Sequence, residues 1–116
     1  MYNHTYHMIL TDKDNQREIK IDFLQTKKVA IILRSLNHKL RQQIIKLLDH
    51  QEKMTVTEIY VQLRLEQSVT SQHLAILRKA NLVRTHREGK FIYYSINYER
   101  LNSINQFVKN LVEISH

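Results

Sequence analysis

The sequence predicts a mainly α-helical fold of about five helices, with one two-stranded β-hairpin in the C-terminal half and a dimeric assembly. Two observations carry this prediction. Residues 55–80 have the pattern of a helix, a short turn and a second helix, which is the arrangement of a helix-turn-helix. The single glycine of the chain, Gly89, then lies between two β-rich runs, "LVRTHR" at 82–87 and "KFIYYSI" at 90–96.

The first half of the chain supplies two further helices after a polar segment. Residues 1–18 show no apolar periodicity, so we expect a flexible or dimer-docking N-terminal arm, followed by one domain over residues 19–116. The stretch "FLQTKKVAIILRSL" at 23–36 has apolar residues at helical spacing. Asn37 is the expected N-cap of the next helix, "HKLRQQIIKLLDH".

The helix-turn-helix region carries start and stop signals. Thr55 or Thr57 is expected to cap the third helix, "EIYVQLRL", and "EQSVT" forms the turn into a fourth helix over residues 69–80. Asn81 should end that helix, because asparagine tolerates the left-handed conformation found at helix ends. In the hairpin that follows, Gly89 supplies the positive φ that a tight turn requires.

The last helix is expected to run from Tyr98 to about Ile114. Its apolar side chains recur at intervals of three and four residues, and the stripe is wider than one side of a small monomer needs. We therefore expect this helix and the first helix to form a dimer interface. The expected interface residues are Leu24, Leu101, Ile104, Val108 and Leu111.

Composition limits the possible functions. The 116 residues carry a formal net charge of +7, which favours a polyanionic partner such as nucleic acid. There is no cysteine, which excludes disulfides, thiolate metal sites and cysteine nucleophiles. No apolar run is long enough to span a membrane, and the N-terminal residues lack the pattern of a signal peptide. We therefore expect a cytoplasmic protein without membrane contact.

Residues 68–96, "SVTSQHLAILRKANLVRTHREGKFIYYSI", resemble the recognition helix and wing of the ArsR family of bacterial winged-helix repressors. The "SQHL" core, the "LRKANLV" continuation and the "REGK" wing tip occur in the family's order and spacing. The upstream "LNHKLRQQIIKLL" is similar to the family's second helix, although Asn37-His38 replaces the usual Asp-Pro. The resemblance covers residues 27–114 and implies a winged helix-turn-helix homodimer that represses transcription from an inverted-repeat operator.

The sequence departs from the family at the positions that sense metals. Where many members carry a Cys-x-Cys pair in the third helix, this chain has Tyr60 and Gln62. The zinc ligands that other members carry on the last helix are also absent, because the matching residues are Tyr98, Arg100, Leu111 and Ile114. The resemblance therefore implies no metal cofactor, and it leaves the existence and identity of a small-molecule inducer unknown.

Double-stranded DNA is the expected partner, and the expected contacts follow from the geometry of a recognition helix. The N-terminal residues of such a helix reach base edges in the major groove, whereas basic residues hold phosphates. We expect base contacts from Ser68, Thr70, Ser71 and Gln72, and phosphate contacts from Arg78, Lys79, Arg87 and Lys90. His73 either touches phosphate or packs half-buried behind the helix. Between Arg64 and Lys90 there are six basic and two acidic residues, so the positive charge is concentrated there.

Two other functions remain open at this stage. The winged domain could dock another protein instead of DNA. It could also belong to a sensor of a small molecule, or of a metal held by histidines such as His4, His7 and His116, although no His pair has i, i+4 spacing on a predicted helix. An enzyme is not expected, because the chain lacks phosphate-binding loops, nucleophile motifs and paired carboxylates.

Overall fold

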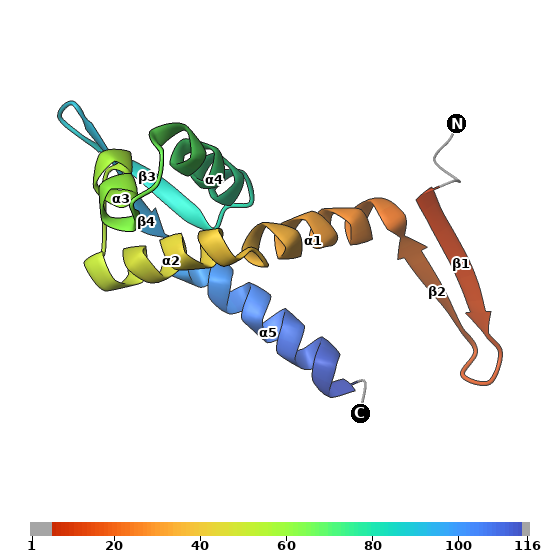
Figure 1. Cartoon of the computed structure of the whole chain (residues 1–116). Helices are drawn as coiled ribbons and strands as arrows, with labels where there is room; N and C mark the ends of the chain where they lie inside the picture. Colours follow the sequence, from red (N-terminus) through yellow and green to blue (C-terminus); the bar gives the residue numbers. More distant parts are fainter. Residues whose placement is uncertain (1–5, 115–116) are drawn as a thin grey trace. The chain divides into compact units, whose positions relative to one another are not determined.

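The computed structural model describes residues 6–114, which form five helices and two antiparallel two-stranded sheets (Figure 1). The chain divides into two compact units, Met1–Arg34 and Ser35–His116. The elements are β1 (His7–Asp12), β2 (Arg17–Asp22), α1 (Phe23–Leu36), α2 (Lys39–Gln51), α3 (Val56–Leu63), α4 (Gln67–Lys79), β3 (Val83–Glu88), β4 (Phe91–Ile96) and α5 (Tyr98–Ile114). The predicted fold class, five helices with a two-stranded wing, is confirmed.

The first unit contains a β-hairpin that the sequence did not predict. Strands β1 and β2 pair in register from His7 opposite Asp22 to Asp12 opposite Arg17. From the sequence we expected a flexible or dimer-docking arm over residues 1–18 and no strand in it, whereas the described part of this segment holds β1 and the first residues of β2. The run "MIL" at 8–10 hid the alternation of a strand, because three consecutive apolar residues fall on both faces.

The hairpin leads directly into α1. The carboxylate of Asp22 accepts hydrogen bonds from the backbone N–H groups of Leu24, at 3.0 Å, and Gln25, at 3.3 Å, and so caps the helix. None of the described side chains between residues 6 and 34 is buried. This unit therefore has secondary structure but no core of its own.

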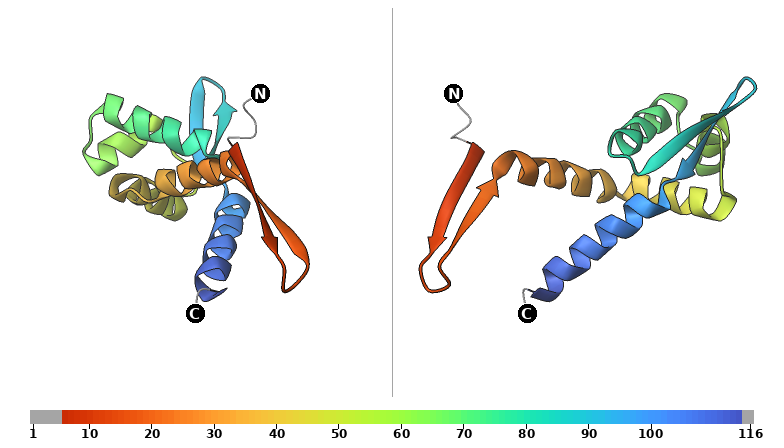
Figure 2. Two further views of the ribbon diagram at one scale, coloured as in Figure 1. Left: turned by 90° about the vertical axis from the view of Figure 1, so that its right-hand side faces the viewer. Right: turned by 180° about the vertical axis from the view of Figure 1, so that it is seen from behind.

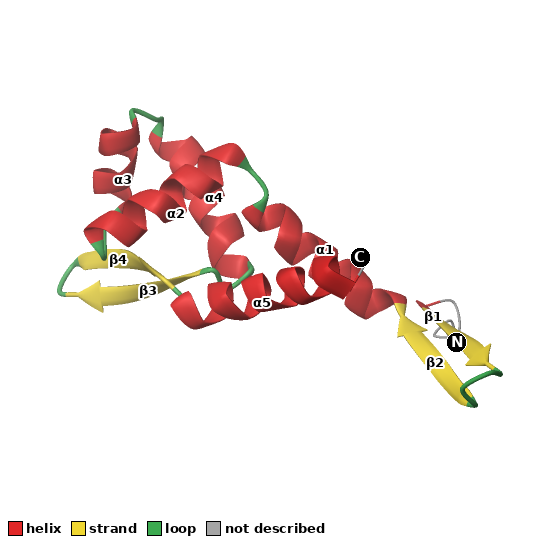
Figure 3. Ribbon diagram, turned by 90° about the horizontal axis from the view of Figure 1, so that it is seen from below, coloured by secondary structure: helices red, strands yellow, loops and turns green. Residues whose placement is uncertain are grey.

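The second unit holds the hydrophobic core. Helices α2, α3 and α4 pack together beside the β3–β4 hairpin (Figure 3), and their apolar stripes meet in the middle. The fully buried aliphatic side chains are Ile44, Leu48, Ile59, Leu74, Leu77, Leu82 and Val83. The tip of the hairpin projects beyond these helices, and so does the C-terminal half of α5 (Figure 2).

Helix starts agree with the sequence in part. Thr55 caps α3 through a capping box in which its hydroxyl accepts from the N–H of Glu58 and the Glu58 carboxylate accepts from the N–H of Thr55. The prediction that Asn37 caps α2 is wrong: the ring of His38 accepts a hydrogen bond from Leu40 N–H at 3.1 Å. Helix α4 begins at Gln67, two residues before the predicted start.

The connections around the wing confirm two sequence predictions. Asn81 follows α4 with φ 63°, and Gly89 turns the hairpin with φ 63°. Asn97 then joins the strands to the last helix. Its buried side chain donates to the carbonyl of Asn81 at 3.1 Å and accepts from the N–H of Arg100 at 3.2 Å, which caps α5. Among the described residues, no helix is long and apolar enough to cross a membrane.

Candidate nucleic-acid interface

Helices α3 and α4 form a helix-turn-helix with a tight turn. Arg64 ends α3 in the left-handed conformation, with φ 56°, and its N–H bonds back to the carbonyls of Tyr60 and Val61. Only residues 64–66 separate α3 from α4, and Glu66 is the N-cap of α4. This short turn fixes the second helix relative to the first, as recognition by a helix in the major groove requires.

The inner face of α4 is anchored in the core. Leu74 and Leu77 are fully buried, and Thr70 is fully buried beside them. The hydroxyl of Thr70 donates to the carbonyl of Glu66 at 3.0 Å. The prediction that Thr70 reads bases is therefore wrong, because its side chain faces the interior and its only donor is already used. Thr70 and Leu74 are four residues apart and therefore lie on the same face of the helix. This spacing indicates burial of Thr70, but because threonine is polar we expected it at the DNA surface.

The opposite face of α4 is exposed and carries small, polar or basic side chains. At 100° per residue, the side chains on this face lie within about 60° of one direction. They are Ser68, Ser71, Gln72, Ala75 and Lys79, all exposed. Ala75, at the centre of the face, was not singled out from the sequence, yet its small side chain lets the helix backbone approach a partner closely. Arg78 is exposed at the edge of the same face.

His73 lies on the flank of α4 that faces α2. Its ring centroid is 4.8 Å from that of His38, and its Nδ1 is 3.2 Å from the Nη1 of Arg41. Burial, together with the charges of these two neighbours, lowers the pKa of His73 below its ordinary value. His73 is therefore half-buried against α2, as one of the two alternatives from the sequence has it, and its contact with phosphate stays a prediction.

The wing presents cations at its tip. Arg87 and Lys90 flank the turn at Gly89 and are exposed. The Nε of Arg87 donates to the carbonyl of Gly89 at 3.1 Å, which holds the guanidinium at the tip. Lys90 lies 5.6 Å from the ring centre of Phe91. A hairpin with this charge can contact the phosphates or the minor groove beside a recognition helix.

A lysine outside the wing neutralises its one carboxylate. The Nζ of Lys53 forms an ion pair with Glu88 and lies 4.8 Å from the ring centre of Tyr93. The hydrogen bond between the two side chains raises the pKa of Lys53 and lowers the pKa of Glu88. His86 approaches the same carboxylate at 3.4 Å. Glu88 therefore opposes an approaching phosphate less than an isolated carboxylate would. This contact has no local signature in the sequence, because the partners are 35 positions apart.

The residues expected at a dimer interface divide into two groups. Leu111 is 58% exposed and Leu24 is 47% exposed, while Leu101 and Val108 are partly exposed. Ile104 is buried at 9% exposure in the single chain, so its main role is to anchor α5, which corrects its assignment to the interface. The stripe of α5 continues outward from it through exposed Phe107, Val112 and Ile114.

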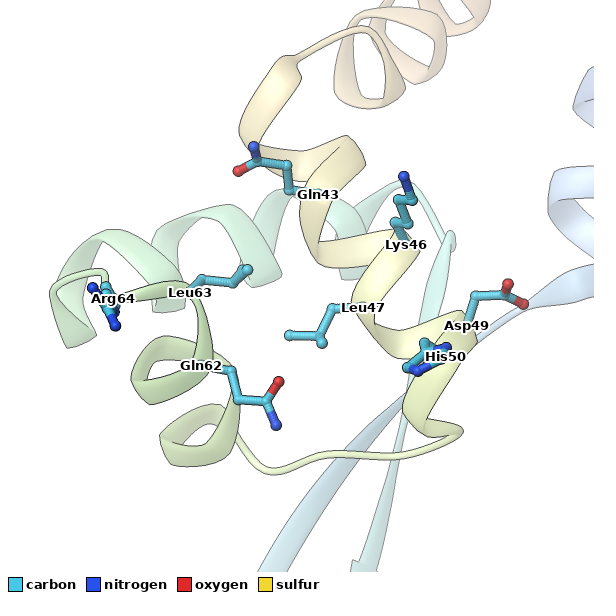
Figure 4. Close-up of a pocket in the computed structure, with 8 residues that line it drawn as sticks. All are labelled: Gln43, Lys46, Leu47, Asp49, His50, Gln62, Leu63 and Arg64. Carbon is cyan, nitrogen blue, oxygen red and sulfur yellow. The ribbon is translucent and has the colours of Figure 1, made fainter.

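A shallow hollow of about 600 Å³ lies between α2 and the end of α3 (Figure 4). Leu47 points into the space between the two helices, and polar side chains such as Gln62 surround it. Its mixed lining shows no convergent set of donors. Among residues 6–114, no group of three or more histidine, aspartate or glutamate side chains is placed to hold a metal. His4 and His116 lie outside the described residues.

Comparisons with known proteins match the part of the chain that contains the helix-turn-helix. Residues 38–85 match the family model described as "Bacterial regulatory protein, arsR family". The transcriptional repressor PagR of Bacillus anthracis is 34% identical over 85 residues, which cover 73% of this chain and 85% of PagR. The transcriptional activator HlyU of Vibrio cholerae is 33% identical over 89 residues, covering 77% of this chain and 75% of HlyU.

Solved structures agree with the sequence matches. The crystal structure of PagR superposes with a TM-score of 0.60 at 31% identity and covers 74% of this chain and 99% of PagR. NolR from Sinorhizobium fredii superposes with a TM-score of 0.62 at 29% identity and covers 92% of this chain and 96% of NolR. This protein belongs to the arsR family of winged helix-turn-helix, DNA-binding transcriptional regulators.

Proposed function

We propose that this chain acts as a homodimeric repressor that reads an inverted-repeat operator in double-stranded DNA and occludes a promoter. The observation that carries the proposal is the exposed face of α4, where Ser68, Ser71 and Gln72 stand at the N-terminal half and Lys79 at the other end. Hydroxyls and amides discriminate base edges, and Gln72 suits adenine. As a bacterial-type regulator it would work in the cytoplasm, where its DNA lies.

Phosphate contacts would come from the edges of this surface. Arg78 and Lys79 lie in the last turn of α4, and Arg87 and Lys90 at the wing tip. These cations are exposed, and the carboxylate nearest to the tip is paired with Lys53. The arrangement supports contacts with the DNA phosphates at both ends of a half-site, with the base-reading residues between these two sets of cations.

Dimerisation supplies the twofold symmetry that an inverted repeat requires. The exposed apolar side chains of α5, Phe107 and Leu111, form a surface that a second copy would cover, and Leu24 of α1 is a further exposed apolar residue expected at the interface. Two recognition helices would then read half-sites separated by about one helical turn, or about 10 bp centre to centre. PagR is a transcriptional repressor, and we extend repression to this chain as part of the proposal.

Selection of binding sites from a random duplex pool tests this function. Enrichment of an inverted repeat with half-sites about 10 bp apart is the expected result. Weak, salt-labile binding without any enriched sequence would contradict it, and would favour a winged domain that docks another protein.

A further inference from the structure

The N-terminal hairpin has one apolar face that nothing in its own unit covers. In an antiparallel pair, residues directly opposite each other lie on the same face. The register places Met8 opposite Ile21 and Leu10 opposite Ile19, so these four side chains form one continuous patch, called here the hairpin face. Met8, Leu10 and Ile19 are 39%, 43% and 39% exposed, and Ile21 is partly exposed.

The hairpin also lacks what a two-stranded sheet needs to be stable. Two strands without a third strand or a packed helix are at best marginally stable in water. No described side chain between residues 6 and 34 is buried, so this unit does not supply the missing contact. The ordered register of β1 and β2 is therefore consistent with a hairpin that is covered in the assembled protein.

Charge indicates what covers it. The segment from His7 to Asp22 carries four carboxylates and three lysine or arginine side chains, in a chain whose net charge is +7. Such a segment gains nothing from a phosphate backbone or an anionic lipid surface. On the hairpin face itself the only charged groups are Asp12 and Arg17, which form an ion pair at 3.2 Å. A surface with balanced charge can meet its own copy without repulsion.

We propose that the hairpin face docks on a second copy of this chain and extends the dimer interface beyond α1 and α5. This rests on the dimer of the proposed function. The hairpin is followed directly by α1, whose first residues Phe23 and Leu24 are exposed and apolar, and Leu24 is one of the residues expected at the dimer interface. In a twofold dimer the two copies make the same contacts with each other, so the hairpin face of each copy is covered by the other copy.

Two glutamate substitutions in one strand give a matched test. Leu10 points to the hairpin face, whereas its neighbour Ile9, which is 59% exposed, points to the other. Leu10→Glu should weaken dimerisation of the full chain about a hundredfold or more in sedimentation analysis, because it buries an unpaired charge in each copy. Ile9→Glu should leave the dissociation constant within about threefold. Equal effects, or no effect of Leu10→Glu, would overturn the proposal.

Hydrogen exchange on the unmodified chain provides a second, independent measurement. Backbone amides of β1 and β2 should be protected at concentrations where the dimer forms and should lose protection on dilution below its dissociation constant. Protection that does not depend on concentration would mean that the chain covers its own hairpin, and would overturn the proposal. If the chain dimerises and selects an inverted repeat but Leu10→Glu has no effect, only this inference fails. If it neither dimerises nor selects a sequence, the proposed function fails.

Discussion

Replacing Arg87 with alanine should flatten the salt dependence of DNA binding by a calculable amount. Each neutralised phosphate contributes about −0.9 to the slope of log K against log salt concentration. Arg87 is exposed at the wing tip, and its bond to the Gly89 carbonyl uses one of five guanidinium donors, which leaves the others for phosphate. A dimer loses two such contacts, so the slope should become less negative by about 1.8. Between about 50 and 200 mM salt, the unmodified protein should lose about 12-fold more affinity than the variant.

Fluorescence anisotropy with the selected operator, repeated at several salt concentrations, measures this slope. Lys109→Ala is the matched control, since Lys109 is an exposed cation on α5, five residues after Ile104 and on the side away from the apolar stripe. It removes the same charge per chain, yet it should change the slope by much less. If the two variants had the same slope, the wing tip would have no role in holding phosphate.

Three further variants test separate parts of the account. Gln72→Ala should lower affinity for the operator by about 1–3 kcal/mol while sparing binding to unrelated duplexes, and equal losses on both would contradict base reading. His73 has a pKa below its ordinary value of 6.5, so the unfolded chain binds more protons and the free energy of unfolding should fall as pH falls through that value. Urea titrations should show a shallower pH dependence for His73→Gln, and an unchanged one would contradict the assignment. Leu77→Ala should destabilise the fold by about 2–5 kcal/mol, whereas Ile76→Ala, at a side chain that is 41% exposed, should cost much less; comparable costs would mean that the faces of α4 are misassigned.

The sequence alone predicted the elements whose signals are local. The positive φ of Gly89 and of Asn81 followed from residue types that favour that conformation, and Thr55 was one of the two threonines expected to cap α3. The helical spacing of the aliphatic residues also placed the core of the winged unit. These features depend on neighbours within a few positions, which a single sequence displays.

Features that depend on distant contacts were missed or misassigned. Thr70 was expected at the DNA surface, but the packing of α4 turns it inward, and only the position of the buried stripe decides this. The contact of Lys53 with Glu88 joins residues far apart in the chain. The hairpin β1–β2 was missed for a different reason: the apolar run at residues 8–10 conceals the alternation of β1, and the alternation of Ile19 and Ile21 with charged residues in β2 was not recognised.

Because the chain contains no cysteine, a single introduced cysteine can report which residues touch DNA. We would place it at Ser71, attach a photoreactive group and map crosslinks on the selected operator, with His50→Cys in the hollow beside α2 as the control. Crosslinks from Ser71→Cys are expected at two symmetry-related positions, about 10 bp apart in the major groove, and few are expected from His50→Cys. Crosslinks from the control alone, or none from position 71, would contradict the claim that α4 reads the DNA.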